Sequence, residues 1–153
     1  MRPRYITCLF VFTIILLFPI FSFSANVKEI GRDGVLIAFD NGVVKDTKTG
    51  LEWIAGPDKD MNWYEAKSWV ESLDTHGGDW RMPILLELKT LHRQGKGTRN
   101  ISPLLKTTGW FIWSVEERDT ASAWSFNLTI GAKTWGYREL HHQGRAFATR
   151  YRR

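Results

Sequence analysis

The chain has 153 residues and a formal net charge of +5, with 21 Lys and Arg against 16 Asp and Glu. Its single cysteine, Cys8, lies in the first 24 residues, so the remainder has no thiol for catalysis, for disulfides or for metal binding. That remainder is long enough to form one domain with a hydrophobic core.

Residues 1–24 have the pattern of a secretory signal peptide. A short basic region with Arg2 and Arg4 precedes an apolar run over Ile6–Phe23, and small residues stand just before Ala25. We therefore expect cleavage after Ser24, a periplasmic or secreted protein, and a mature domain over residues 25–153. The alternative is an uncleaved membrane anchor, because the run approaches bilayer-spanning length. With cleavage, contact with the membrane is only transient.

The first part of the mature chain predicts a β-meander. A β-rich run over Gly34–Asp40 ends at Asn41-Gly42, a pair that favours a type I′ hairpin turn. Val43-Val44 is the expected returning strand. A polar turn over residues 46–50 then leads into a strand over residues 51–54.

Two helices follow. The first is predicted over Asn62–Leu73, where Asn62 and Glu65 have the spacing of a capping box and apolar residues recur at helical intervals. The second is predicted from Pro83, which suits the first helical turn, and Gly95 is expected to lie beyond its end.

The rest of the chain reads as β-structure after a loop over residues 95–109. Strands are predicted over residues 110–114, around the alternating run at residues 124–129, over residues 133–137 and over residues 145–151. Strands, two helices and further strands predict a single α+β domain.

Charge is unevenly distributed and provides the main candidate for binding. Residues 25–86 carry a net charge of −4 and residues 87–153 a net charge of +7. A basic half suggests an anionic partner, with nucleic acid not expected for an exported protein; alternatively, the halves neutralise each other within one fold. The candidate ligand-binding residues are Lys133, Trp135, Tyr137, Arg138, Arg145, Arg150, Arg152 and Arg153, on strands expected to be adjacent or on the tail. Arginine suits sulfate and carboxylate, whereas the alternative is a solvated edge that discourages aggregation.

Other combinations of residues indicate no catalytic, metal or cofactor site. Residues 58–62 resemble the start of a calcium loop, but Trp63 and Trp69 occupy positions where an EF-hand needs Gly and Glu, so a helix-capping loop is the simpler interpretation. His141-His142 on a strand would point to opposite faces. No serine-hydrolase motif is present. Trp80-Arg81 could bind an anion, but we expect a buried Trp80 and an Arg81 that ties the turn to a carboxylate such as Glu87.

An ordered series of motifs resembles the Lcl C-terminal domain family over about residues 42–153. Its carriers include residues 46–53 and the run Asp79-Trp80-Arg81-Met82-Pro83. The full set of signature residues is Asp46, Gly50, Trp53, Trp63, Trp80, Arg81, Pro83, Glu87, Trp113 and Trp124. This chain departs from the family at Ile84, where relatives usually have a capping Thr, and at Tyr151, where relatives often have a cysteine.

The resemblance implies a C-type-lectin-like α+β domain of an exported bacterial protein, with two helices packed on short antiparallel sheets. In some relatives it implies binding of sulfated or other cell-surface glycans, and adhesion. We therefore expect a non-catalytic binding module for an anionic polysaccharide or another envelope component. The alternative is a structural or protein-interaction module of the bacterial envelope that binds no glycan.

Overall fold

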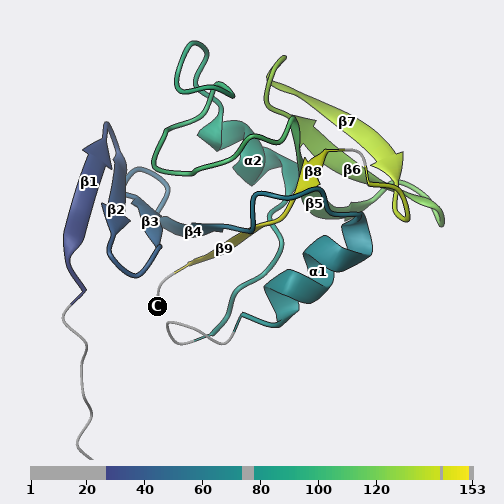
Figure 1. Cartoon of the computed structure of the whole chain (residues 1–153), viewed down its shortest axis with the longest axis horizontal. Helices are drawn as coiled ribbons and strands as arrows, with labels where there is room; N and C mark the ends of the chain where they lie inside the picture. The colour runs from purple at the N-terminus through teal and green to yellow at the C-terminus, as the bar shows by residue number, and fades with distance from the viewer. Residues whose placement is uncertain (1–26, 74–77, 142, 152–153) are drawn as a thin grey trace, which may run out of the picture.

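The computed structural model describes residues 27–73, 78–141 and 143–151, and the predicted signal peptide, His142, Arg152 and Arg153 lie outside them. Two β-sheets and two helices make up the described chain, which confirms the α+β prediction (Figure 1). Within these residues, no helix has the length and apolar character needed to cross a membrane.

The first sheet has five strands in the order β1-β2-β3-β4-β9. Its strands are β1 (Glu29–Asp33), β2 (Leu36–Phe39), β3 (Val44–Asp46), β4 (Leu51–Ala55) and β9 (Phe147–Tyr151). The neighbouring strands in this order pair antiparallel, which confirms the β-meander and adds β1, a strand that we did not predict. The hairpin at Asn41-Gly42 forms, but only Gly42 has a positive φ, so the turn is not type I′.

The second sheet has four strands in the order β7-β6-β5-β8, with β7 at its outer edge (Figure 1). Its strands are β5 (Phe111–Glu117), β6 (Ser122–Asn127), β7 (Ala132–Tyr137) and β8 (Gly144–Arg145). β6 pairs antiparallel with both β5 and β7, whereas β8 runs parallel to β5.

The final strand that the sequence predicted over residues 145–151 is divided between the two sheets. β8 pairs with β5 in the second sheet, and β9 pairs with β4 in the first. The prediction that the basic residues of the C-terminal half lie on adjacent strands is therefore wrong, because β7 has β6 as its neighbour and contacts neither β8 nor β9 through the ladder.

Both helices pack on β5 of the second sheet, and α1 also contacts the first sheet. Helix α1 (Trp63–Glu71) contacts β5 and β9, and helix α2 (Leu85–Leu91) contacts β5 and β6. The capping box of α1 is confirmed, since the Asn62 side chain accepts from Glu65 N and the Glu65 carboxylate accepts from Asn62 N, each at 2.9 Å. α2 begins at Leu85, so Pro83 precedes the helix and is not in its first turn.

Two hydrophobic cores lie on either side of β5 and β6. The first joins α2 to both sheets through residues such as Trp53, Leu88, Ile112 and Phe126. The second joins α1 to the opposite side and includes Trp63 and Trp113. Because β7 is an edge strand beyond both cores, it presents side chains to solvent on both of its faces.

Candidate functional site

One face of β7 brings together three of the predicted ligand-binding residues. Alternation along the strand places Lys133, Trp135 and Tyr137 on the same side, and all three are exposed. Trp135 is 44% exposed and Tyr137 52% exposed, whereas Trp53, Trp63, Trp80 and Trp113 are buried. Trp124 lies directly opposite Trp135 in the β6–β7 ladder, so its side chain shares this face.

Cations lie over these rings. The Lys133 ammonium lies 4.6 Å from the ring centre of Trp124, and the Arg118 guanidinium lies 4.0 Å from that of Trp135. Trp135 and Tyr137 meet edge to face at 5.7 Å. We name the group Arg118, Trp124, Lys133, Trp135 and Tyr137 the β7 outer strip. It offers aromatic faces for stacking together with Lys and Arg donors for an anion.

Trp124 was predicted only as a signature residue, and Arg118 is the member of the strip that the sequence analysis did not single out at all. It lies in the turn between β5 and β6, and its neighbour Asp119 binds Ser122 through both carboxylate oxygens. Recognition of residues 117–122 as a hairpin turn would have paired β5 with β6, and β6 in turn pairs with β7, so the turn could have been placed beside β7. The sequence analysis recognised strands on either side but did not assign their pairing.

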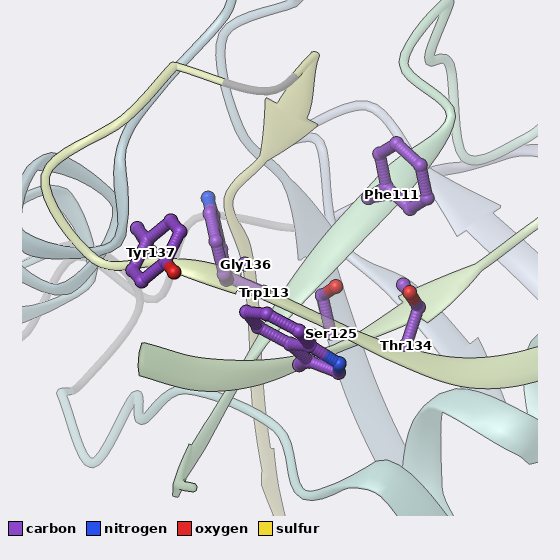
Figure 2. A pocket seen from close by; sticks show the side chains of 7 residues that line it. Phe111, Trp113, Ser125, Thr134, Gly136 and Tyr137 are labelled. Carbon is purple, nitrogen blue, oxygen red and sulfur yellow. The ribbon is translucent and has the colours of Figure 1, made fainter. Parts of the chain in front are cut away.

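The opposite face of the same sheet contains a pocket of about 280 Å³ (Figure 2). Its lining residues are Phe111, Trp113, Ser125, Thr134, Trp135, Gly136 and Tyr137. Trp113, Ser125 and Thr134 form one row across β5, β6 and β7, because each is the register partner of the next. Trp135 and Tyr137 line the pocket as well, although strand alternation places their side chains on the face of the β7 outer strip.

Arg145 lies inside the protein and not on the predicted binding surface. It is 7% exposed, and its guanidinium contacts Asp58 at 2.8 Å and Asp60 at 2.5 Å. Burial by itself raises the pKa of Asp58, but hydrogen bonds from Arg145 and Thr108 outweigh it and hold the pKa below its usual value. Arg145 thus anchors the loop that precedes α1.

Asp58 and Asp60 are also the residues of the calcium-loop alternative. Both carboxylates face Arg145, and Asn62 caps α1, so the simpler interpretation as a helix-capping loop is confirmed. Over the described part of the chain, no group of three or more His, Cys, Asp or Glu side chains is arranged to hold a metal ion. His141 follows β7, and its Nδ1 lies 3.5 Å from the Glu65 carboxylate at the start of α1.

Arg150 is likewise an internal residue. It is 9% exposed, pairs with Glu52 at 2.9 Å and donates to the Gly78 carbonyl at 2.7 Å. Its guanidinium also lies 4.2 Å from the Trp80 ring centre. β9 and β4 are neighbours in the first sheet although they lie about a hundred positions apart in the chain. The ion pair of Arg150 with Glu52 links these two strands.

Arg138 is mostly buried, but its carboxylate partner is exposed. It pairs with Glu117 at 3.1 Å, donates to the Thr120 carbonyl, and lies over the rings of Trp63 and Tyr64. The predicted set therefore divides in two. Lys133, Trp135 and Tyr137 are exposed together, and Arg138, Arg145 and Arg150 are held by carboxylates.

Apart from Trp124, which belongs to the β7 outer strip, the signature residues with described contacts have structural roles. Asp46 accepts from the backbone of the following turn, and Gly50 has a φ of 77° there. Arg81 forms two hydrogen bonds with Glu87, at 2.8 and 2.5 Å, which confirms the predicted tie between the turn and a carboxylate. Trp53 and Trp80 are buried, in line with a role in the cores.

The indole nitrogens of two signature tryptophans form hydrogen bonds within the second core. Trp63 Nε1 donates to the Ser114 carbonyl and Trp113 Nε1 to the Met61 carbonyl, both at 2.8 Å. These bonds fix the ring of Trp113 at the pocket. Each bond joins the segment around α1 to β5 over about fifty positions of sequence.

Comparison with known proteins gives one family. A family model described as the Lcl C-terminal domain matches residues 42–148, which is more than half of the chain. A search of curated proteins finds no match.

Proposed function

The chain belongs to the Lcl C-terminal domain family, and from this membership and its surface we propose an exported, non-catalytic module that binds an anionic glycan or similar envelope polymer. The proposed binding surface is the β7 outer strip. Sulfate or carboxylate groups contact Lys133 and Arg118, and sugar rings stack on Trp135 and Tyr137. Export, a periplasmic or secreted location and a lectin-like character belong to this proposal.

The observation that carries the proposal is the exposure of aromatic and cationic side chains in one continuous strip. Single exposed apolar side chains are normal on a protein surface, whereas adjoining exposed aromatic rings bordered by polar groups are typical of interaction sites. Cation–ring contacts at 4.0 and 4.6 Å orient the Arg118 and Lys133 side chains while leaving N–H donors for an anion.

Only a few of the basic residues in the C-terminal half belong to the proposed binding surface. Arg145 and Arg150 face carboxylates of the acidic half, and Lys96 pairs with Asp33 in the same way. The two halves therefore neutralise each other in part, as one alternative predicted. Among the described residues, exposed cations outside the strip, such as Lys106, lie on other parts of the surface and have no exposed aromatic pair beside them, so the proposal rests on the strip and not on the total net charge.

The test is binding to immobilised heparin in a salt series, with variants Lys133→Ala and Trp135→Ala. We expect each to weaken binding by about three- to tenfold, the effect of losing roughly 1 kcal/mol. Lys133→Ala should also lower the dependence on salt, because it removes one ionic contact.

The chain offers matched controls. Trp110 is 44% exposed, as Trp135 is, and lies under Arg99 at 5.4 Å, while Lys106 is an exposed lysine on the loop before β5. Trp110→Ala and Lys106→Ala should leave heparin binding unchanged. Equal losses in strip and control variants would show binding by overall charge and would favour the structural or protein-interaction module.

A further inference from the structure

Among the sheet edges of the described chain, the edge of β7 is both long and open (Figure 1). An edge strand presents N–H and C=O groups to which another strand can add. β8 has only two residues, and the edge of β9 is met by Arg81, which exchanges two backbone hydrogen bonds with Thr149 at 3.0 and 2.9 Å. β1 has a bulge between Glu29 and Gly31 and several charged residues. β7, by contrast, pairs with β6 over six consecutive residues without a shift in register.

The register of β7 determines which backbone groups face its free edge. In an antiparallel ladder, opposite residues alternate between pairs that exchange backbone hydrogen bonds and pairs that do not. Arg138 N donates to the Ala121 carbonyl at 2.9 Å, one position beyond Tyr137, the last residue of β7. Tyr137 therefore exchanges no such bonds with β6, and by alternation neither do Trp135 and Lys133. The N–H and C=O groups of these three residues point away from β6.

These outward groups are open to a further strand. Within the described residues, no hydrogen bond involves the backbone of Lys133 or Trp135, and the Tyr137 carbonyl accepts from Leu140 N at 3.2 Å. β7 has no proline and a single charged residue, Lys133, so it lacks the usual protection of an edge strand. An open backbone edge beside two exposed aromatic rings favours the addition of a strand.

The outward residues of β7 are complementary to those of a second copy. Antiparallel pairing about a two-fold axis at Trp135 sets Trp135 opposite its own copy and Lys133 opposite Tyr137 of the other chain. Every outward-facing residue then meets an outward-facing residue, so their backbone groups can bond in both directions. No like charges stand opposite each other, and each lysine ammonium lies beside a tyrosine ring.

The other face of the strand fits the same register. There Thr134 stands opposite Gly136 of the second copy. Because Gly136 has no side chain, the junction contains no pair of bulky residues on this face. Pairing of this kind joins the two second sheets into one continuous sheet.

We propose that the chain forms a two-fold symmetric dimer through the edge of β7, in the register that sets Trp135 opposite Trp135. The dimer goes beyond the proposed function and does not rest on it, because the backbone edge is open with or without a glycan. It places two β7 outer strips side by side, so that one polymer can contact both copies. The interface is small, and we expect a dissociation constant on the order of 100 μM.

A pair of introduced cysteines tests the register. Cys8, the single cysteine of the chain, is replaced by Ser in every variant. Residues that exchange backbone bonds have Cα atoms about 5.5 Å apart, within the span of a disulfide. With a mild oxidant, an equimolar mixture of Lys133→Cys and Tyr137→Cys should therefore form linked dimers at least about tenfold faster than either variant alone. In either variant alone the two cysteines lie roughly 14 Å apart along the strands, beyond the reach of a disulfide.

Sedimentation equilibrium over a concentration series measures the dimer itself. Trp135→Pro removes an N–H that faces the free edge and leaves the ladder with β6 intact. Trp135→Ala is its matched control, because both variants lack the ring and only the proline lacks the donor. We expect Trp135→Ala to weaken the dimer about fivefold and Trp135→Pro to weaken it at least about tenfold more.

Each measurement has an outcome that overturns the proposal. Equal dissociation constants for Trp135→Ala and Trp135→Pro would show that the backbone edge does not join the copies. Cross-linking of the cysteine mixture no faster than of the single variants would overturn the register. A chain that stays monomeric up to about 1 mM overturns the dimer and leaves the edge to a strand of another protein.

The dimer and the proposed function can fail separately. Dimerisation is measured without glycan, so a monomeric chain whose heparin binding falls in Lys133→Ala and Trp135→Ala leaves the proposed function standing and overturns only the dimer. A dimer that binds no heparin does the opposite. Circular dichroism on each variant establishes that it is folded, and the cysteine mixture tests the dimer even if Trp135→Pro is not.

Discussion

Arginines of the C-terminal half differ in what surrounds their guanidinium groups. Arg145 is buried among Asp58, Asp60 and Thr108, and its side chain packs so closely on Gly109 that a carbon added there would lie 2.3 Å from Arg145 Cγ. We expect Arg145→Ala to reduce the free energy of unfolding by about 1–3 kcal/mol, because two carboxylates lose their partner but are partly exposed to water. Urea denaturation measures this loss.

The matched variant for that prediction is Lys133→Ala, which removes one positive charge from the exposed strip. We expect it to change the free energy of unfolding by less than about 0.5 kcal/mol while weakening glycan binding. Arg145→Ala should show the reverse pattern once its folded fraction is taken into account. Unaltered stability in Arg145→Ala would contradict the structural role of the ion pairs.

The start of helix α2 depends on an element elsewhere in the chain. Ile84 stands at its N-cap without a side-chain hydrogen bond, as the sequence indicated. Glu87 accepts from Ile84 N at 3.0 Å, and Glu116 on β5 accepts from Leu85 N at 2.6 Å. The carboxylate of Glu116 therefore satisfies a free N–H group and complements the positive end of the helix dipole.

We expect Glu116→Ala to destabilise the protein by about 1 kcal/mol, the usual effect of losing a helix cap. In the double variant, Ile84→Thr should recover part of that loss, because the Thr hydroxyl supplies a local cap of the kind usual in the family. A double-mutant cycle followed by thermal denaturation gives the coupling. Strict additivity of the two changes would show that Glu116 does not act as the cap.

Elements whose determinants are local were predictable, and those with distant determinants were not. The cap of α1 needs only Asn62 and Glu65, which are three positions apart, and the strand over residues 133–137 was recognised from its own residues. The cap of α2 lies 31 positions away, at Glu116. No local pattern signals such a partner.

The candidate site shows the same division. The strand that carries Lys133, Trp135 and Tyr137 was predicted, and strand alternation then places the three side chains on one face, although the sequence analysis did not assign that face. The separation of Arg145 from Arg150 depends on the passage of the chain from β8 to β9 at Ala146, a change of sheet within an apparently continuous strand. Their carboxylate partners lie 87 and 98 positions away, which sequence periodicity cannot reveal.

At the scale of the whole molecule, half-buried carboxylate–guanidinium pairs connect separate segments and make stability depend on pH. Glu87 is buried beside Arg81. Burial alone raises the pKa of Glu87, but hydrogen bonds from Arg81 and from Ile84 N lower it below its ordinary value of 4.5. The pKa of Asp58 lies below its ordinary value of 3.8, as Arg145 and Thr108 outweigh burial there too. A lowered folded-state pKa means that the unfolded chain binds more protons as the pH falls.

The stabilisation from these two carboxylates is therefore complete above the unfolded-state values of 4.5 and 3.8, and it is lost as the pH falls through the lower folded-state values. We expect the urea midpoint to be constant from about pH 7 to pH 5 and to fall progressively below that. Glu87→Gln should lower the midpoint at pH 7 and make its fall in acid shallower, since one of the two protonation steps is removed. Glu71→Gln, which removes only an exposed pair with Lys67 at 3.9 Å, is the control and should follow the unsubstituted protein. An acid limb of equal steepness in Glu87→Gln would mean that other carboxylates govern acid unfolding and that the Arg81–Glu87 tie does not join the turn to α2 energetically.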